Sequence, residues 1–183
     1  MGNFYLDIET TGLKPKEHKI ITIQYQELHR NTGEAIGELI ILKEWESSEK
    51  DILAQFLRDS KITDEYKFTF IPTGYHLGFE HNFLKERAAF HGFPCVDILN
   101  RPFIDLMSVG VLMNRGEFKG SGLDKITGKP APGINIPIWY SNKEYDKIIK
   151  YVETEAKEFI KLNTWLYKEL PTCLERFKRE SRI

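Results

Sequence analysis

The chain has 183 residues, of which 41% are hydrophobic and 13% aromatic, so it can form one domain with a sizeable core. Its 26 Lys and Arg residues nearly balance 27 Asp and Glu residues, and the formal net charge of -1 excludes a globally basic nucleic-acid-binding surface. The two cysteines lack metal-ligand spacing and exclude a disulfide framework. The sequence contains no apolar leader and no membrane-spanning run. We therefore expect one domain over residues 1–183 in a soluble, intracellular protein of the cytoplasm, without a membrane partner.

The first predicted element is a strand over residues 3–9, which ends at a Thr-Thr-Gly turn. With the two-residue period of a strand, its hydrophobic residues share one face: Phe4, Leu6 and Ile8. The opposite face carries Tyr5, Asp7 and Glu9. The two acids are attached about 6 to 7 Å apart, close enough to bind one hard divalent cation. The alternative is a solvated acidic face.

The turn after this strand contains Gly12, for which we expect a backbone angle that a Cβ would oppose. Two more strands are predicted over residues 20–26 and 38–43, joined by turn residues at 31–34, which gives an antiparallel meander. In the second strand, one face is expected to carry Ile21, Ile23 and Tyr25.

The remaining chain alternates between predicted helices and short strands. A helix is expected to begin at Ser47-Ser48, and a fourth strand is expected over residues 67–71. A helix over 77–91, a fifth strand over 95–98 and a helix over 103–113 should follow. Residues 116–137 are rich in Gly and Pro and are predicted to be mostly a mobile loop, whereas a long amphipathic helix is predicted from Asn142. This order predicts an α/β fold, a mixed sheet with helices on both faces.

Two segments resemble motifs of a known enzyme superfamily. The hexamer Asp7-Ile8-Glu9-Thr10-Thr11-Gly12 resembles the first motif of the DEDD 3′–5′ exonucleases, a superfamily of polymerase proofreading domains and RNA-trimming enzymes. Residues 74–84, with the sequence Gly-Tyr-His-Leu-Gly-Phe-Glu-His-Asn-Phe-Leu, resemble the second motif. Glu80 replaces the usual Asp of that motif and His76 replaces the usual Asn. Without the first motif, an amphipathic helix with a solvated acid would explain this segment equally well.

The long C-terminal helix contains a segment that resembles the tyrosine form of the third motif. Its sequence is Tyr151-Val152-Glu153-Thr154-Glu155, with Glu155 at the position of the usual Asp. Each helical residue turns by about 100°, so Glu155 shares the face of Tyr151 and Glu153 lies on the opposite side. The alternative is that Tyr151 packs at the helix edge and Glu155 is one of several solvated acids.

The resemblance extends from residue 4 to about residue 165 and implies a ribonuclease H-like fold that hydrolyses terminal phosphodiesters of DNA or RNA. It implies two divalent cations, Mg²⁺ or Mn²⁺, held by four acids: Asp7, Glu9, Glu80 and Glu155. Tyr151 would position the attacking water, because a tyrosine with its ordinary pKa near 10 is a poor base at neutral pH. The expected nucleic-acid contacts are Thr10, Thr11, Gly12, Leu13 and His76.

Two other functions are compatible with the sequence. The Glu-for-Asp replacements suggest a nucleic-acid-binding module that has lost activity, and the aromatic C-terminal helix around Trp165 and Tyr167 suggests a subunit-interaction domain. The choice between DNA and RNA, the strandedness of the substrate and the oligomeric state are left open.

Overall fold

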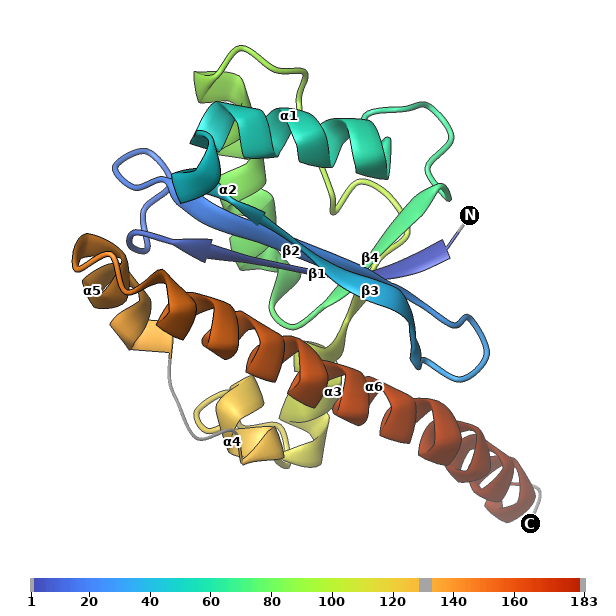
Figure 1. The fold of residues 1–183 in the computed structure, drawn as a ribbon. Helices are drawn as coiled ribbons and strands as arrows, with labels where there is room; N and C mark the ends of the chain where they lie inside the picture. The colour runs from blue at the N-terminus through green and yellow to red at the C-terminus, as the bar shows by residue number, and fades with distance from the viewer. Residues whose placement is uncertain (1, 129–132, 182–183) are drawn as a thin grey trace.

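The computed structural model describes residues 2–128 and 133–181, and its centre is a five-stranded mixed sheet. Figure 1 shows this sheet between layers of helices. The sheet order is β3-β2-β1-β4-β5. The first three strands pair antiparallel, whereas β4 and β5 run parallel to β1. Their bounds are Gly2–Thr10, Ile20–Leu28, Ala35–Lys43, Phe70–Gly74 and Ile104–Asp105. The predicted meander and mixed sheet are confirmed.

Helices cover both faces of this sheet, as predicted (Figure 1). On one face lie α1 (Glu49–Ser60) and α2 (Leu77–Phe90), which share a core with β1 and β2. On the other face lies α6 (Tyr145–Glu180), packed beside α3 (Leu106–Met113) and α4 (Leu123–Thr127). The short helix α5 (Ile136–Ser141) contacts the first half of α6. Single 3-10 turns occupy Glu44–Glu46 and Gly133–Asn135.

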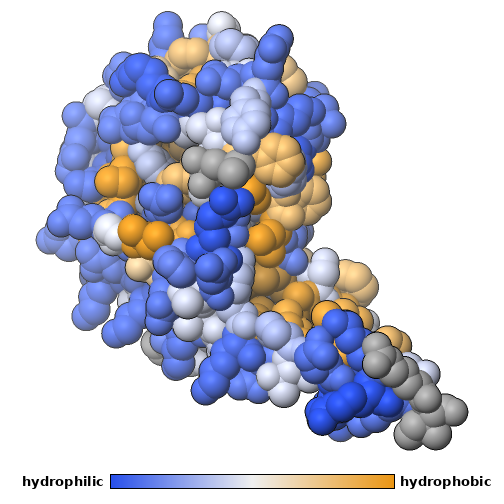
Figure 2. Space-filling view, turned by 90° about the vertical axis from the view of Figure 1, so that its right-hand side faces the viewer, coloured by the Kyte–Doolittle hydropathy of each residue, from blue (hydrophilic) through white to orange (hydrophobic). Residues whose placement is uncertain are grey.

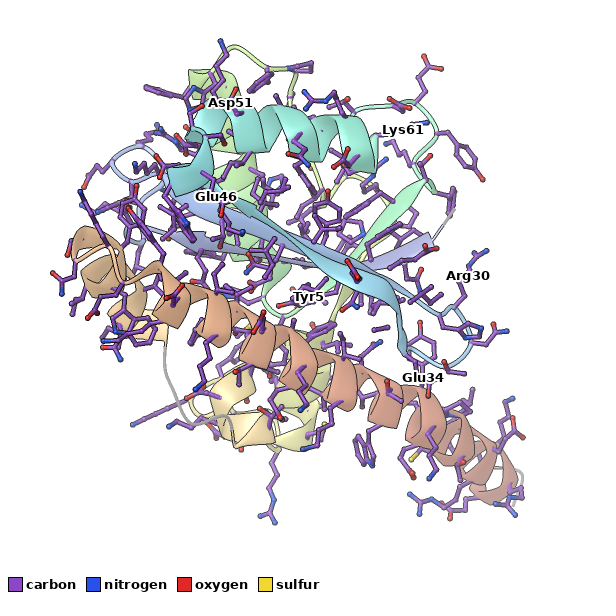
Figure 3. All side chains as sticks on the ribbon, in the orientation of Figure 1. Tyr5, Arg30, Glu34, Glu46, Asp51 and Lys61 are labelled. Carbon is purple, nitrogen blue, oxygen red and sulfur yellow. The ribbon has the colours of Figure 1, made fainter. Side chains whose placement is uncertain are left out.

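The two faces of β1 belong to different cores. Leu6 and Ile8 are buried against α1 and α2. Tyr5 is buried on the α6 side, where its ring centroid lies 4.8 Å from that of Phe159. Figure 3 shows Tyr5 in the layer between the sheet and α6. The alternation predicted for this strand is therefore confirmed, and its two acids lie on the α6 side of the sheet.

A β-bulge in β2 contradicts the face predicted for Ile21. The pairing passes from Glu9 opposite Thr22 directly to Thr10 opposite Ile20, so Ile21 has no residue opposite it. Such an extra residue reverses the alternation of its strand. Ile21 consequently packs in the core beside α5 and α6, whereas Ile23 and Tyr25 pack on the opposite face.

Several predicted elements differ from the observed ones. Residues 95–98 form no strand. Val96 and Ile98 are buried in the core beside α1 and α2, but they do not pair with the sheet. Ile104–Asp105 takes the fifth position instead, and β4 lies a few residues later than predicted. The segment predicted as loop over 116–137 contains α4 and the start of α5, where Pro137 is tolerated in the first helical turn; part of it, residues 129–132, lies outside the described residues.

Helix α1 begins as predicted, since Ser48 caps it by accepting a hydrogen bond from the Asp51 N–H. One face of α6 is buried as far as Leu166. All residues from 171 to 180 are exposed. This end stands away from the rest of the molecule, with apolar side chains among hydrophilic ones (Figure 2). Among the described helices, none is both long and apolar enough to cross a bilayer.

Candidate metal centre

Three carboxylates predicted as metal ligands converge on the α6 side of the sheet. Asp7 and Glu9 come from the end of β1, and Glu155 comes from α6. Each offers an oxygen within 4.8 Å of the oxygens of the other two, and all three side chains are partly exposed. This arrangement brings Glu155 of α6 beside the two strand acids, as the third motif predicts.

The fourth predicted acid, Glu80, lies in the first turn of α2 and is only 3% exposed. Burial raises the pKa of the Glu80 carboxyl well above its usual range, and the negative charge of Asp7 raises this pKa further. One Glu80 oxygen, Oε2, has no hydrogen-bond partner among the described residues. Because Asp7 contributes to this shift, Glu80 lies near the three clustered acids, although it is not one of the three whose oxygens lie within 4.8 Å of one another.

Tyr151 borders the carboxylate cluster from α6. Burial raises the pKa of its hydroxyl, and the charges of Glu155 and Glu9 raise this pKa further. Its hydroxyl also hydrogen-bonds Glu155, and a Cβ added to Gly133 would lie 3.0 Å from that hydroxyl oxygen. Glu153 is exposed, as the helical geometry predicts.

Two residues that the sequence pattern does not single out, Tyr5 and Gln24, contact the cluster. Asp7 Oδ2 accepts hydrogen bonds from the Tyr5 hydroxyl at 3.2 Å and from Gln24 Nε2 at 2.7 Å. The signal that could have revealed Gln24 is the alternation of polar residues along β2, at Thr22, Gln24 and Gln26. A buried polar stripe of this kind indicates that the facing strand carries polar partners.

The turn predicted to contact nucleic acid is well ordered by its own hydrogen bonds. Thr10 Oγ1 donates to the Gly12 carbonyl at 2.7 Å, and the Thr11 N–H donates to the Lys19 carbonyl at 3.0 Å. Gly12 does not have a positive φ, contrary to the prediction. Glycine fits this position for a different reason, because a Cβ would lie 2.4 Å from the ring of His18, which would have to shift.

Leu13 ends this turn and is 82% exposed. It borders a pocket of about 390 Å³, which is also lined by Lys14, Lys16, Phe79 and Phe83. The pocket therefore lies between the turn and α2, the helix that carries Glu80.

His76 is exposed and precedes α2 in a left-handed conformation, with φ 69° and ψ 45°. Asp105 stabilises this turn, because its carboxylate accepts the His76 N–H at 2.9 Å and the Leu77 N–H at 3.0 Å. Asp105 also caps α3 through the Met107 N–H. Asp105 is a functional neighbour that was not predicted, although an Asp before a helix is a typical capping signal.

The ligand chemistry of the cluster suits hard divalent cations. The four acids offer only oxygen atoms, which Mg²⁺ and Mn²⁺ prefer, and no cysteine or histidine belongs to the described cluster. Carboxylates this close repel one another, and a bound cation would relieve that repulsion. The buried Glu80 Oε2, which lacks a hydrogen-bond partner in the described chain, fits the same requirement.

A family model of the RNase_H superfamily matches residues 4–167. The chain belongs to the RNase_H superfamily. The mixed sheet with helices on both faces is accordingly an RNase H-like fold. The match includes β1, α2 and the first part of α6, the three elements that carry the four acids.

Solved structures with a similar fold include exonuclease I. The zinc-bound form of the *E. coli* ExoI–ssDNA complex has a TM-score of 0.63 and 12% identity, and the alignment covers 95% of this RNase_H superfamily chain and 42% of that chain. *E. coli* exonuclease I with a dA16 oligonucleotide has a TM-score of 0.48 and 14% identity over 64% of this chain and 31% of that chain. The chain thus spans less than half the length of these proteins. No curated protein sequence matches it.

Proposed function

We propose that this RNase_H superfamily chain is a metal-dependent 3′–5′ exonuclease that hydrolyses terminal phosphodiesters of DNA or RNA. The proposal depends on one observation above all, the convergence of Asp7, Glu9 and Glu155 oxygens within 4.8 Å, beside the buried Glu80. The three motifs that resemble the DEDD exonucleases supply these same acids. The likeness in fold to an exonuclease solved with single-stranded DNA supports a nucleic-acid substrate.

The four acids would hold two divalent cations, Mg²⁺ or Mn²⁺. Asp7 would contact both ions, Glu9 and Glu155 would hold one, and Glu80 would hold the other. When bound, a pair of such ions activates water and neutralises the charge that develops on the leaving oxygen. The acids themselves supply the negative charge that attracts the ions, and their positions on β1, α2 and α6 keep them rigid.

Tyr151 would orient the attacking water and would not remove its proton. Burial and the neighbouring acids raise its pKa, so the hydroxyl stays protonated at neutral pH and can donate a hydrogen bond. The Trp139 ring borders it, with its centroid 6.3 Å from that of Tyr151, and Gly133 leaves room for the hydroxyl, which a Cβ at this position would approach to 3.0 Å. A fixed donor of this kind suits a positioning role.

The terminal nucleotide would bind beside the turn that follows β1. We infer that Thr10, Thr11, Gly12, Leu13 and His76 contact it. Exposed Leu13 and the half-buried pocket residue Phe79 offer an apolar surface for a base, whereas Lys14 and Lys16 offer charge for phosphates.

Incubation of the protein with end-labelled DNA and RNA oligonucleotides tests the proposal. We expect shortening from the 3′ end that requires Mg²⁺ or Mn²⁺ and stops with a chelator. Asp7→Ala should abolish shortening without unfolding the chain, while Asp146→Ala, which removes an exposed acid of α6, should leave it unchanged. Equal rates for Asp7→Ala and the parent would exclude this site. Metal binding without shortening would favour the nucleic-acid-binding module.

A further inference from the structure

One oxygen of the proposed metal ligand Asp7 is held by two side chains. The Tyr5 hydroxyl donates to Asp7 Oδ2 at 3.2 Å, and Gln24 Nε2 donates to the same atom at 2.7 Å. Tyr5 lies two residues before Asp7 on β1, and Gln24 lies directly opposite Asp7 in the pairing of β1 with β2. The strand register therefore places both donors beside this carboxylate.

Both donors are themselves fixed by burial. Tyr5 is 2% exposed and its ring packs against Phe159 of α6, whereas Gln24 is fully buried. An ionised carboxylate only accepts hydrogen bonds, so the amide of Gln24 must turn its NH₂ group toward Asp7. The amide oxygen then points elsewhere, and it has no hydrogen-bond partner among the described residues.

The two hydrogen bonds to Asp7 counteract the electrostatic repulsion between the acids of the cluster. Asp7 lies close to Glu9, Glu155 and Glu80, and carboxylates at such distances repel one another. Without other contacts, a short side chain with two rotatable bonds would turn away from its neighbours. Two hydrogen bonds to one oxygen fix the plane of the carboxylate and stabilise its charge.

We propose that Tyr5 and Gln24 are positioning residues that hold Asp7 in the orientation that binds the divalent cations. The inference rests on the proposed function, because it assumes that Asp7 is a metal ligand. Neither side chain contacts the substrate in this role. Each acts through Asp7, as outer partners of metal ligands commonly do.

Titration with Mn²⁺ by calorimetry tests this assignment, and the chain offers two matched controls. The site variants are Tyr5→Phe and Gln24→Met. Tyr25→Phe removes another buried hydroxyl that donates to a carboxylate, Asp59 at 2.6 Å, on the α1 side of the sheet. Gln26→Met removes another buried amide of β2, which donates to the Gly37 carbonyl at 2.8 Å.

We expect both site variants to bind Mn²⁺ about tenfold or more weakly than the parent, and both controls to bind it as the parent does. Thermal melts of all four variants separate this effect from a general loss of stability. If Gln24→Met does not fold, Tyr5→Phe alone tests the positioning role, because it removes only one oxygen atom. Unchanged Mn²⁺ affinity in the folded site variants would overturn the positioning role of Tyr5 and Gln24 but not the proposed function. A parent that binds no Mn²⁺ would overturn the proposed function together with this assignment.

Discussion

Glu153 and Glu155 are two residues apart on α6, yet only Glu155 contributes an oxygen to the carboxylate cluster, whereas Glu153 is exposed. Glu155→Gln should therefore weaken Mn²⁺ binding and abolish shortening of oligonucleotides, because it removes the charge of one ligand. Glu153→Gln is the matched control and should change neither. Calorimetry and the labelled-oligonucleotide assay measure both effects, and the reverse outcome would move the site to the other face of the helix.

The convergence of the candidate ligands was predictable where chemistry and spacing coincide. Asp7 and Glu9 follow from strand alternation, and Glu155 follows from its position one helical turn after Tyr151. The polar alternation of β2 marks Gln24 as buried and polar, but its contact with Asp7 was not predictable, because the contact depends on a strand register that sequence spacing does not set. The reason why glycine fits at position 12 was also not predictable, because it depends on the close approach of the His18 ring in the folded chain.

At the scale of elements, a buried ion pair joins the two helices on one face of the sheet. Glu49 of α1 accepts hydrogen bonds from Arg87 Nε at 2.8 Å and Nη2 at 2.7 Å. Its carboxylate also contacts His91 Nε2 and the Ile20 N–H of β2, each at 2.8 Å. The same residue therefore connects α1, α2 and the start of β2.

This connection should make the fold sensitive to acid. Burial alone would raise the pKa of Glu49, but the hydrogen bonds from Arg87, His91 and Ile20 outweigh it and leave the pKa below its ordinary value of 4.5. A carboxylate with a lowered folded pKa stabilises the fold above the unfolded pKa, and this contribution disappears as pH falls through the folded pKa. Glu49→Gln should therefore cost about 3 kcal/mol at neutral pH and much less in acid.

Thermal or denaturant melts at neutral and acidic pH measure this difference. Glu46→Gln is the control, since the Glu46 side chain is 61% exposed in its ion pair with Lys43 and surface pairs contribute little. An equal loss of stability for Glu49→Gln at both pH values would show that the charge of Glu49 is not what joins the helices.

The elements that sequence analysis missed share one cause. Hydrophobic periodicity reports burial, and burial does not require strand pairing, as Val96 and Ile98 show by packing in the core without joining the sheet. The bulge at Ile21 is a related case, because one extra residue changes the face of its neighbours without any change in composition.

At the scale of the whole molecule, the C-terminal end of α6 makes no contribution to the core. Residues 171–180 are all exposed, and this stretch begins at Pro171, which lacks the N–H for a helical hydrogen bond. The family match ends nearby, at residue 167. Deletion of residues 171–183 should therefore leave the melting temperature and Mn²⁺ affinity unchanged.

A longer deletion is the contrasting control for this prediction. Removal of the chain from residue 159 onward also removes Phe159, which is fully buried against Tyr5, and should unfold the protein. Circular dichroism melts of the two truncated chains measure the difference. A marked loss of stability in the shorter deletion would show that the exposed end supports the fold.

The fold class was predictable as a whole because the patterns of strands and helices agree with one another along most of the chain. Strand alternation at residues 3–9, the cap at Ser48 and the apolar stripe from Asn142 each specify an element locally. The path of residues 116–137 was not predictable, since its short helices pack against distant elements and lack a strong period of their own.

The acids of the candidate site come from segments far apart in the sequence, and this determines when the site can form. Asp7 and Glu9 emerge from the ribosome early, whereas Glu155 emerges only after α6 is largely synthesised. A nascent chain therefore carries the strand acids without their partner and without the helix that covers their side of the sheet. Under the proposed function, translation products that end before α6 lack Tyr151 and Glu155 and are expected not to shorten oligonucleotides.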